Sequence, residues 1–148
     1  MNIMKTIFKA ALSCLITYYI VHNYVPKDHG EILAIASPLS TVAGILFGFI
    51  IAYVTAFASN SQNELIQNMR KTNMYSPLMT QLSHTGFGLI TSCIFMVMSI
   101  FSPYKKIIPN YDITWDFSLL ILGFTILIYS LFSFWGCWRK VHKVIKHL

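Results

Sequence analysis

The chain has 148 residues, of which 55% are hydrophobic and only 11% are charged. Soluble domains carry about 25% charged residues, so this composition excludes an ordinary soluble domain, a disordered chain and a nucleic-acid-binding domain. The formal net charge is +6. The positions of the basic residues matter more than this sum, because basic residues in loops set the orientation of a membrane protein. The sequence predicts an all-α integral membrane protein, a single domain with four transmembrane helices.

The first apolar run covers residues 7–25 and is flanked at its start by Lys5 and Lys9. A charged start before an apolar run also describes a signal peptide. The nearest small-residue triplet, Ala34 to Ala36, lies too far beyond the run to be its cleavage site. We therefore expect an uncleaved first transmembrane helix over residues 7–25, close to the length that a bilayer core requires.

The second apolar run extends from Ile32 to Ala58, which is too long for one straight span. Pro38 divides the run, and proline suits the first turn of a helix. The second helix is therefore expected to begin near Leu39 and to cross the membrane over residues 39–57.

The polar stretch that follows predicts a cytoplasmic helical hairpin at about residues 59–83, formed by extensions of the second and third helices. Ser76 is expected to cap the third helix, with Pro77 in its first turn. This helix would cross the membrane over residues 84–101. Apolar and basic side chains of the stretch form a candidate contact for a cytosolic partner: Leu65, Ile66, Met69, Arg70 and Lys71.

The fourth apolar run predicts a span over residues 115–136, with Trp115 at one membrane interface and Trp138 at the other. In the tail, residues 139–148, apolar residues recur at helical spacing among cations. This pattern is typical of a short amphipathic helix on an anionic membrane surface, and a solvated basic tail is the alternative. The expected surface anchors are Arg139, Lys140, Lys143 and Lys146.

Basic residues are distributed unequally between the two sides of this topology. The side with both termini and residues 59–76 would carry eight Lys and Arg residues, and the other side would carry three. Because basic loops remain in the cytoplasm, both termini are expected to be cytoplasmic.

Small residues recur every four positions in the second span, at Gly44, Gly48, Ala52 and Ala56. Such a ladder lets two helix backbones approach closely within a membrane. It predicts either packing within the monomer or a face for self-association, which could line an oligomeric pore.

Asp, Glu, Lys and Arg are absent from the middle of the predicted spans, which argues against a proton-coupled transporter. His84 is expected at the cytoplasmic mouth of the third span, in register with Gly88 and Ser92. These three residues are candidates for a pore or gate, because protonation of a histidine can switch its charge. The alternative is an interfacial histidine without such a role, beside hydroxyls that bond to their own helices.

Motifs of catalysis are lacking: the sequence contains no G-x-S-x-G, H-E-x-x-H or Walker loop. The cysteines Cys14, Cys93 and Cys137 are widely spaced in or beside apolar runs, whereas zinc sites and disulfide frameworks use clustered cysteines. The chain is therefore expected not to be an enzyme and to bind no cofactor or metal.

Several segments resemble RexB, the small four-span inner-membrane protein of phage exclusion systems. They are the His-x-Tyr-x-Pro segment at His22–Pro26, Leu39-Ser40 with Ala43-Gly44, then Ile51-Ala52, Thr55, Leu65 and Met74-Tyr75. The resemblance covers roughly half of the chain and agrees in length and topology. It implies a multi-pass protein of the bacterial inner (cytoplasmic) membrane, which a soluble partner activates after infection and which then depolarises the cell by passing ions.

The expected function is thus an oligomeric membrane effector of phage exclusion, or abortive infection, that permeabilises or depolarises the membrane. The expected partners are the lipid bilayer, further copies of the chain and a cytosolic sensor protein, with no nucleic acid. An immunity protein that binds a pore-forming bacteriocin within the bilayer is an alternative with the same topology. A structural subunit of a larger membrane complex is a third interpretation.

Overall fold

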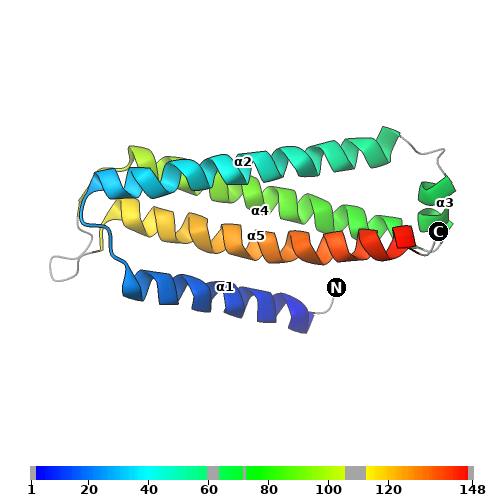
Figure 1. Cartoon of the computed structure of the whole chain (residues 1–148), viewed down its shortest axis with the longest axis horizontal. Helices are drawn as coiled ribbons and strands as arrows, with labels where there is room; N and C mark the ends of the chain where they lie inside the picture. Colours follow the sequence, from blue (N-terminus) through cyan, green and yellow to red (C-terminus); the bar gives the residue numbers. More distant parts are fainter. Residues whose placement is uncertain (1–2, 60–63, 72, 106–112, 147–148) are drawn as a thin grey trace.

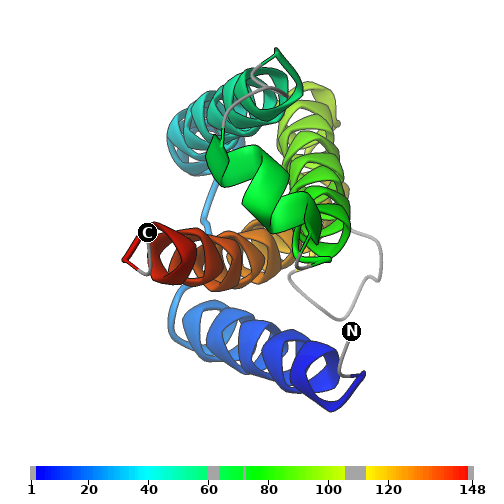
Figure 2. The ribbon, with the colours of Figure 1, turned by 90° about the vertical axis from the view of Figure 1, so that its right-hand side faces the viewer.

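The computed structural model describes residues 3–59, 64–71, 73–105 and 113–146, and these contain helices and no β-strand. The five helices are α1 (Ile3–Asn23), α2 (His29–Ser59), α3 (Glu64–Lys71), α4 (Tyr75–Phe101) and α5 (Trp115–Lys146). The long helices α2, α4 and α5 run alongside one another, while α1 lies beside α5 and α3 covers one end (Figures 1 and 2). The expectation of an all-helical fold is confirmed.

Three of the described helices are long and apolar enough to cross a membrane: α2, α4 and the part of α5 from Trp115 to Lys140. Helix α1 has 21 residues but is not among these three. The structure therefore supports a membrane protein with three candidate spans, and the fourth span stays a prediction.

Helix α2 begins ten residues before the position expected from Pro38, so the predicted helix entry there is wrong. Pro38 lies inside the helix. The true start is fixed by Asp28, whose Oδ1 accepts a hydrogen bond from the Glu31 N–H at 2.8 Å, and by Glu31, whose Oε2 accepts from the Lys27 N–H at 2.9 Å. This reciprocal cap resembles a capping box, and membrane helices tolerate an internal proline.

A tight turn separates α3 from α4, so residues 59–83 do not form simple extensions of two long helices. Asn73 has φ 54°, the N–H of Met74 donates to the Met69 carbonyl, and the N–H of Asn73 donates to the Arg70 carbonyl. These two bonds form the Schellman motif that ends α3. Helix α4 then begins at Tyr75, and Ser76 lies within it rather than capping it, which corrects the expected start.

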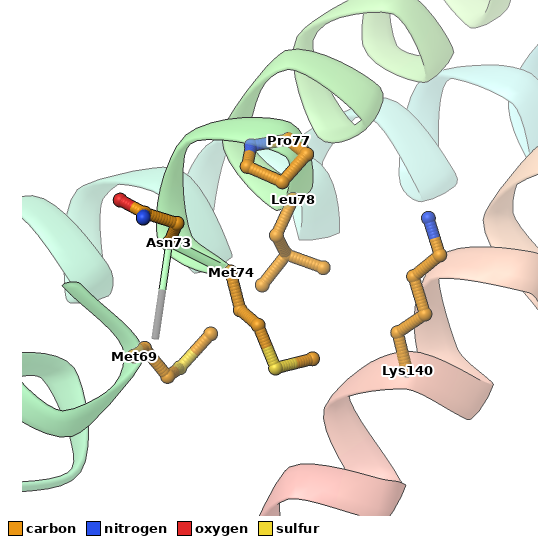
Figure 3. A pocket seen from close by; sticks show the side chains of 6 residues that line it. All are labelled: Met69, Asn73, Met74, Pro77, Leu78 and Lys140. Atoms are coloured by element: carbon orange, nitrogen blue, oxygen red, sulfur yellow. The ribbon is translucent and has the colours of Figure 1, made fainter. Parts of the chain in front are cut away.

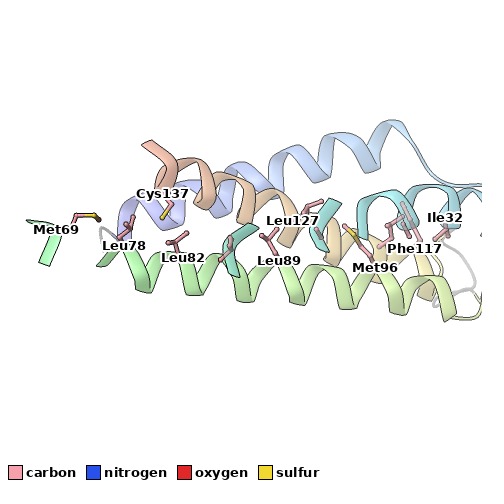
Figure 4. Packing of buried hydrophobic residues seen from close by; sticks show 13 residues of the cluster. Ile32, Met69, Leu78, Leu82, Leu89, Met96, Phe117, Leu127 and Cys137 are labelled. Atoms are coloured by element: carbon pink, nitrogen blue, oxygen red, sulfur yellow. The ribbon is translucent and has the colours of Figure 1, made fainter. Parts of the chain in front are cut away.

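Helices α4 and α5 form the best-packed contact of the molecule, and it follows a heptad pattern (Figure 4). Seven of the eight buried positions of α4 alternate spacings of four and three: Leu78, Leu82, Thr85, Leu89, Ser92, Met96 and Ser99. The eighth, Gly86, packs against α2 instead. Helix α5 presents the same spacing: Asp116, Leu120, Gly123, Leu127, Ser130, Phe134 and Cys137. Alternating spacings of four and three are the signature of coiled-coil packing. Within these two series, the hydroxyl residues of α4 recur every seven positions, at Thr85, Ser92 and Ser99. The small residues of α5 also recur every seven positions, at Gly123, Ser130 and Cys137.

The basic tail is the last part of α5 rather than a separate surface helix, because α5 continues without a break to Lys146. At about 1.5 Å per residue its 32 residues span about 48 Å, longer than the hydrocarbon core of about 30 Å. Of the predicted anchors, Arg139 and Lys140 have exposed side chains. The side chains of Lys143 and Lys146, and all of residues 147–148, lie outside the described residues.

Candidate functional site

A cavity of about 780 Å³ lies between α1, α4 and α5. It exists because α1 packs on α5 and stands away from α4 (Figure 2). Helix α1 contributes Thr6 and Lys9 to the lining. The polar lining from the other two helices comprises Gln81, His84, Thr85 and Thr91 of α4 and Tyr129, Ser130, Ser133, Arg139 and Lys140 of α5.

One end of the cavity is strongly basic, and we define this basic end by Lys9, Gln81, Arg139 and Lys140. Gly136 creates space for it: a Cβ at this glycine would lie 3.3 Å from Lys9 Nζ and 3.5 Å from Gln81 Nε2. Lys140 Nζ donates to Gln81 Oε1 at 2.5 Å. Acidic residues are absent from the described lining. The arrangement therefore offers several donors and a net positive charge to a ligand.

Further along the cavity, Ser130 is 1% exposed and its hydroxyl has no hydrogen-bond partner in the part of the chain that the structure describes. A Cβ at Gly88 would collide with the Ser130 Oγ, so any larger residue at this position would force the Ser130 side chain to move. The neighbouring hydroxyl, of Thr85, donates to the Gln81 carbonyl of its own helix at 2.8 Å. A buried hydroxyl without a protein partner is unusual, and Ser130 is therefore a candidate for contact with a molecule that occupies the cavity.

The three residues expected to form a pore or gate are separated by the structure. His84 and Gly88 both line the cavity. Ser92 is fully buried, and its Oγ donates to the Gly123 carbonyl of α5 at 2.6 Å. Ser92 therefore holds two helices together, while His84 and Gly88 remain candidates for contact with ions or a ligand.

The small-residue ladder of α2 points away from the rest of the monomer. Gly44, Gly48, Ala52 and Ala56 are all exposed. A Cβ at Gly44 or Gly48 would contact nothing within 4 Å. The residues that α2 packs on its neighbours are Ile32, Ala36, Ala43 and Ile50. At Gly44 and Gly48 the ladder therefore does not pack within the described part of the monomer, which was one of the two interpretations left open by the sequence.

The expected partner contact on α3 is only partly available. Ile66 and Met69 are both 3% exposed, and Met69 belongs to the hydrophobic core. Arg70 lies over the Tyr75 ring, 5.0 Å from its centroid, and Lys71 is exposed. The side chain of Leu65 lies outside the described residues. A small pocket of about 150 Å³ opens beside Met69 and Met74, facing Lys140 of α5 (Figure 3).

A contact between a histidine and an aspartate at the opposite end of the bundle was not expected from the sequence. Asp116 is fully buried at the start of α5; its Oδ2 lies 2.9 Å from His29 Nδ1, and its Oδ1 accepts from the Phe117 N–H at 2.9 Å. The N-terminal end of a helix stabilises such a carboxylate. The contact joins the first turns of α2 and α5. His29 and Asp116 are 87 residues apart, and no motif connects them.

The structure brings no metal centre together. Within its described residues, no group of three or more His, Cys, Asp or Glu side chains could hold a metal ion. The cysteines are free, and they are exposed at Cys14, half-buried at Cys93 and buried at Cys137.

No family model, curated protein or solved structure matches this chain.

Proposed function

We propose that the chain is a self-associating membrane effector that permeabilises or depolarises the bacterial inner membrane, as in a phage-exclusion or abortive-infection system. The observation that carries the proposal is the exposure of the ladder Gly44, Gly48, Ala52 and Ala56. In a membrane, an exposed face of small residues is an efficient contact for another helix, because backbones approach closely and gain packing energy. A second copy of α2 offers the same face.

The polarity of α1 supports a fourth span. Its two buried side chains, Ser13 and Thr17, are polar, whereas Phe8 and Tyr19 on the outside are 69% and 71% exposed. In water this distribution would be unfavourable, since apolar side chains face inward in soluble proteins. In lipid it is favourable. The proposed topology therefore has four spans and both termini in the cytoplasm, in agreement with the distribution of basic residues.

The cavity beside α1 supports a role in permeation. Ion paths through membranes are lined by hydroxyl groups, carbonyl groups and titratable side chains. His84, Thr91 and Tyr129 provide such groups along the cavity. Arg70 and Lys71 on α3 provide the exposed charge through which a cytosolic sensor would act.

The test combines an assembly assay with a membrane-potential dye in cells that express the chain, with and without phage challenge. Gly48→Ile places a branched side chain on the ladder where nothing inside the monomer obstructs it. We expect this variant to remain folded, to lose cross-linked oligomers and to lose the depolarisation that follows challenge. The matched control, Val42→Phe, adds bulk at another exposed position of α2 and should retain both.

The proposal fails if Gly48→Ile leaves both assembly and depolarisation unchanged. A wild-type chain that never changes the dye signal, but protects cells from one pore-forming bacteriocin, would establish the immunity protein instead.

A further inference from the structure

We infer that the cavity between α1, α4 and α5 binds one anionic phospholipid, with its phosphate at the basic end and an acyl chain along the deeper part. This inference goes beyond the proposed function and does not depend on self-association. It rests on the charge of the lining, on the unpartnered hydroxyl of Ser130 and on the apolar side chains of Phe87 and Ile126 further along the cavity.

The basic end contains the cations Lys9, Arg139 and Lys140 and, in the described lining, no acidic side chain. Lys9 projects from α1 over Gly136 of α5, and both Lys140 and Arg139 repel it. The described lining contains no carboxylate to offset this repulsion. A phosphate group there would relieve the repulsion and accept charge-assisted hydrogen bonds from Lys9, from Arg139 and from the Lys140 protons that are not donated to Gln81. A net negative headgroup is therefore preferred to a zwitterionic one.

The Gln81 side chain keeps this end polar and open. Its amide oxygen accepts from Lys140 Nζ, and its Nε2 donates to the Ser133 carbonyl at 3.2 Å. These two bonds hold Lys140 against α4 and leave Lys9 over Gly136. The donors thus come from three different helices, as expected of a built site rather than of a chance cluster on one helix.

Ser130 lies six residues before Gly136 on α5, about 9 Å further along the cavity. The glycerol esters of a phospholipid lie between its phosphate and its acyl chains, and an ester carbonyl that reaches Ser130 would offer the acceptor that this hydroxyl lacks within the described chain. Beside Ser130 the apolar side chains of Phe87 and Ile126 line the cavity together with Thr91 and Tyr129, and they would contact the acyl chain. The volume of about 780 Å³ is within the range of ligand sites, about 300–1,000 Å³.

The test uses the full chain, stripped of lipid in a zwitterionic detergent and titrated with three probes: dioleoyl phosphatidylglycerol, dioleoyl phosphatidylcholine and inorganic phosphate. Binding is measured by native mass spectrometry and by the shift in melting temperature. We expect phosphatidylglycerol to bind at least about tenfold more tightly than phosphatidylcholine, with inorganic phosphate weaker than either. Equal binding of the two lipids, or phosphate binding as tight as that of phosphatidylglycerol, would overturn the inference.

Variants locate the site. Lys9→Gln and Lys140→Gln should each lower the affinity for phosphatidylglycerol about tenfold. Lys27→Gln, which removes an exposed cation outside the cavity lining, should not lower it. The Gly48→Ile variant should bind normally, which separates this inference from the proposed function. Unchanged affinity in both Lys9→Gln and Lys140→Gln would contradict the assigned site.

Ser130→Ala gives a second, independent readout. Removal of a buried hydroxyl without a partner should leave the lipid-free protein as stable as before or more stable. The same change should lower the melting-temperature increase that phosphatidylglycerol produces. A lipid-free Ser130→Ala protein that is less stable, with an unchanged lipid response, would show that the hydroxyl serves the fold and not the ligand.

Discussion

Helix α5 has two contacts rich in small and hydroxyl residues, and they differ in how the hydroxyl groups bond. Toward α4, the Oγ of Ser99 donates to the Asp116 carbonyl at 2.7 Å and that of Ser92 donates to the Gly123 carbonyl at 2.6 Å. Toward α1, Ser13 and Thr17 donate to carbonyls of α1 itself. The first contact is bonded across the interface, and the second relies on shape and on a single hydroxyl–hydroxyl bond from Thr125 to Thr17.

This difference predicts that α4 and α5 form a fixed unit and that α1 can move relative to them. The α4–α5 contact is continuous from Asp116 to Cys137, whereas α1 leaves the cavity open beside it. When the hydroxyl groups of an interface donate to carbonyls of their own helix, separation of the two helices breaks few hydrogen bonds, because each hydroxyl keeps its partner. We therefore expect α4 and α5 to stay together while α1 adjusts to whatever occupies the cavity.

The largest effect should come from bulk added to the α4–α5 contact. A Cβ at Gly123 would lie 2.9 Å from Met96 Cγ and 3.2 Å from the Met96 backbone N. Gly123→Val should therefore lower the free energy of unfolding by about 3 kcal/mol, the upper part of the usual range for overpacking. The measurement is unfolding in mixed micelles followed by circular dichroism.

The control for this prediction is Gly44→Val on α2, where a Cβ contacts nothing within 4 Å. In dilute micelles that each hold a single copy of the chain, so that the proposed ladder contact between copies does not contribute, its free energy of unfolding should change by less than about 1 kcal/mol, because only helix propensity is altered. Equal destabilisation by the two substitutions would mean that the α4–α5 contact is not the tighter one.

The sequence was sufficient to predict a helix end where nearby residues, such as prolines, mark it. The end of α4 at Phe101 and the start of α5 at Trp115 agree with the predicted limits of those helices, since Pro103 and Pro109 bound the apolar runs. The exposed ladder of α2 was also visible as a motif, although its orientation was not. Which face of a helix is buried depends on its neighbours, and an apolar helix in lipid gives no polar face from which to infer it.

The heptads of α4 and α5 were missed for a different reason. Hydroxyl residues such as Ser92 were interpreted singly, each bonded to its own helix, whereas the repeat of seven that Ser92 forms with Thr85 and Ser99 along α4 would have indicated a common partner. The contact between His29 and Asp116 gave no such signal, because it depends on the meeting of two helix ends. The start of α2 was misplaced because Pro38 was given more weight than the cap formed by Asp28 and Glu31.

A smaller effect is expected when the bonds between α4 and α5 are removed one at a time. Ser92→Ala and Ser99→Ala should each lower the free energy of unfolding by about 1 kcal/mol, as is usual for hydrogen bonds between membrane helices. Thr80→Ala is the matched control on α4, since the exposed Thr80 hydroxyl donates to the Ser76 carbonyl of its own helix. No difference between Ser99→Ala and Thr80→Ala would show that the bonds across the interface contribute nothing to stability.

The smallest effect should come from the matching change on α1. Thr17→Val keeps the shape of the side chain and removes the acceptor of the Thr125 hydroxyl, but that hydroxyl also donates to the Ile121 carbonyl at 2.8 Å and so retains a partner. We expect a loss below about 0.5 kcal/mol in the same unfolding assay, less than for Ser99→Ala. A loss as large as that of Ser99→Ala would mean that α1 is held by a specific bond. The cavity would then be a fixed feature of the fold rather than one that opens and closes with α1.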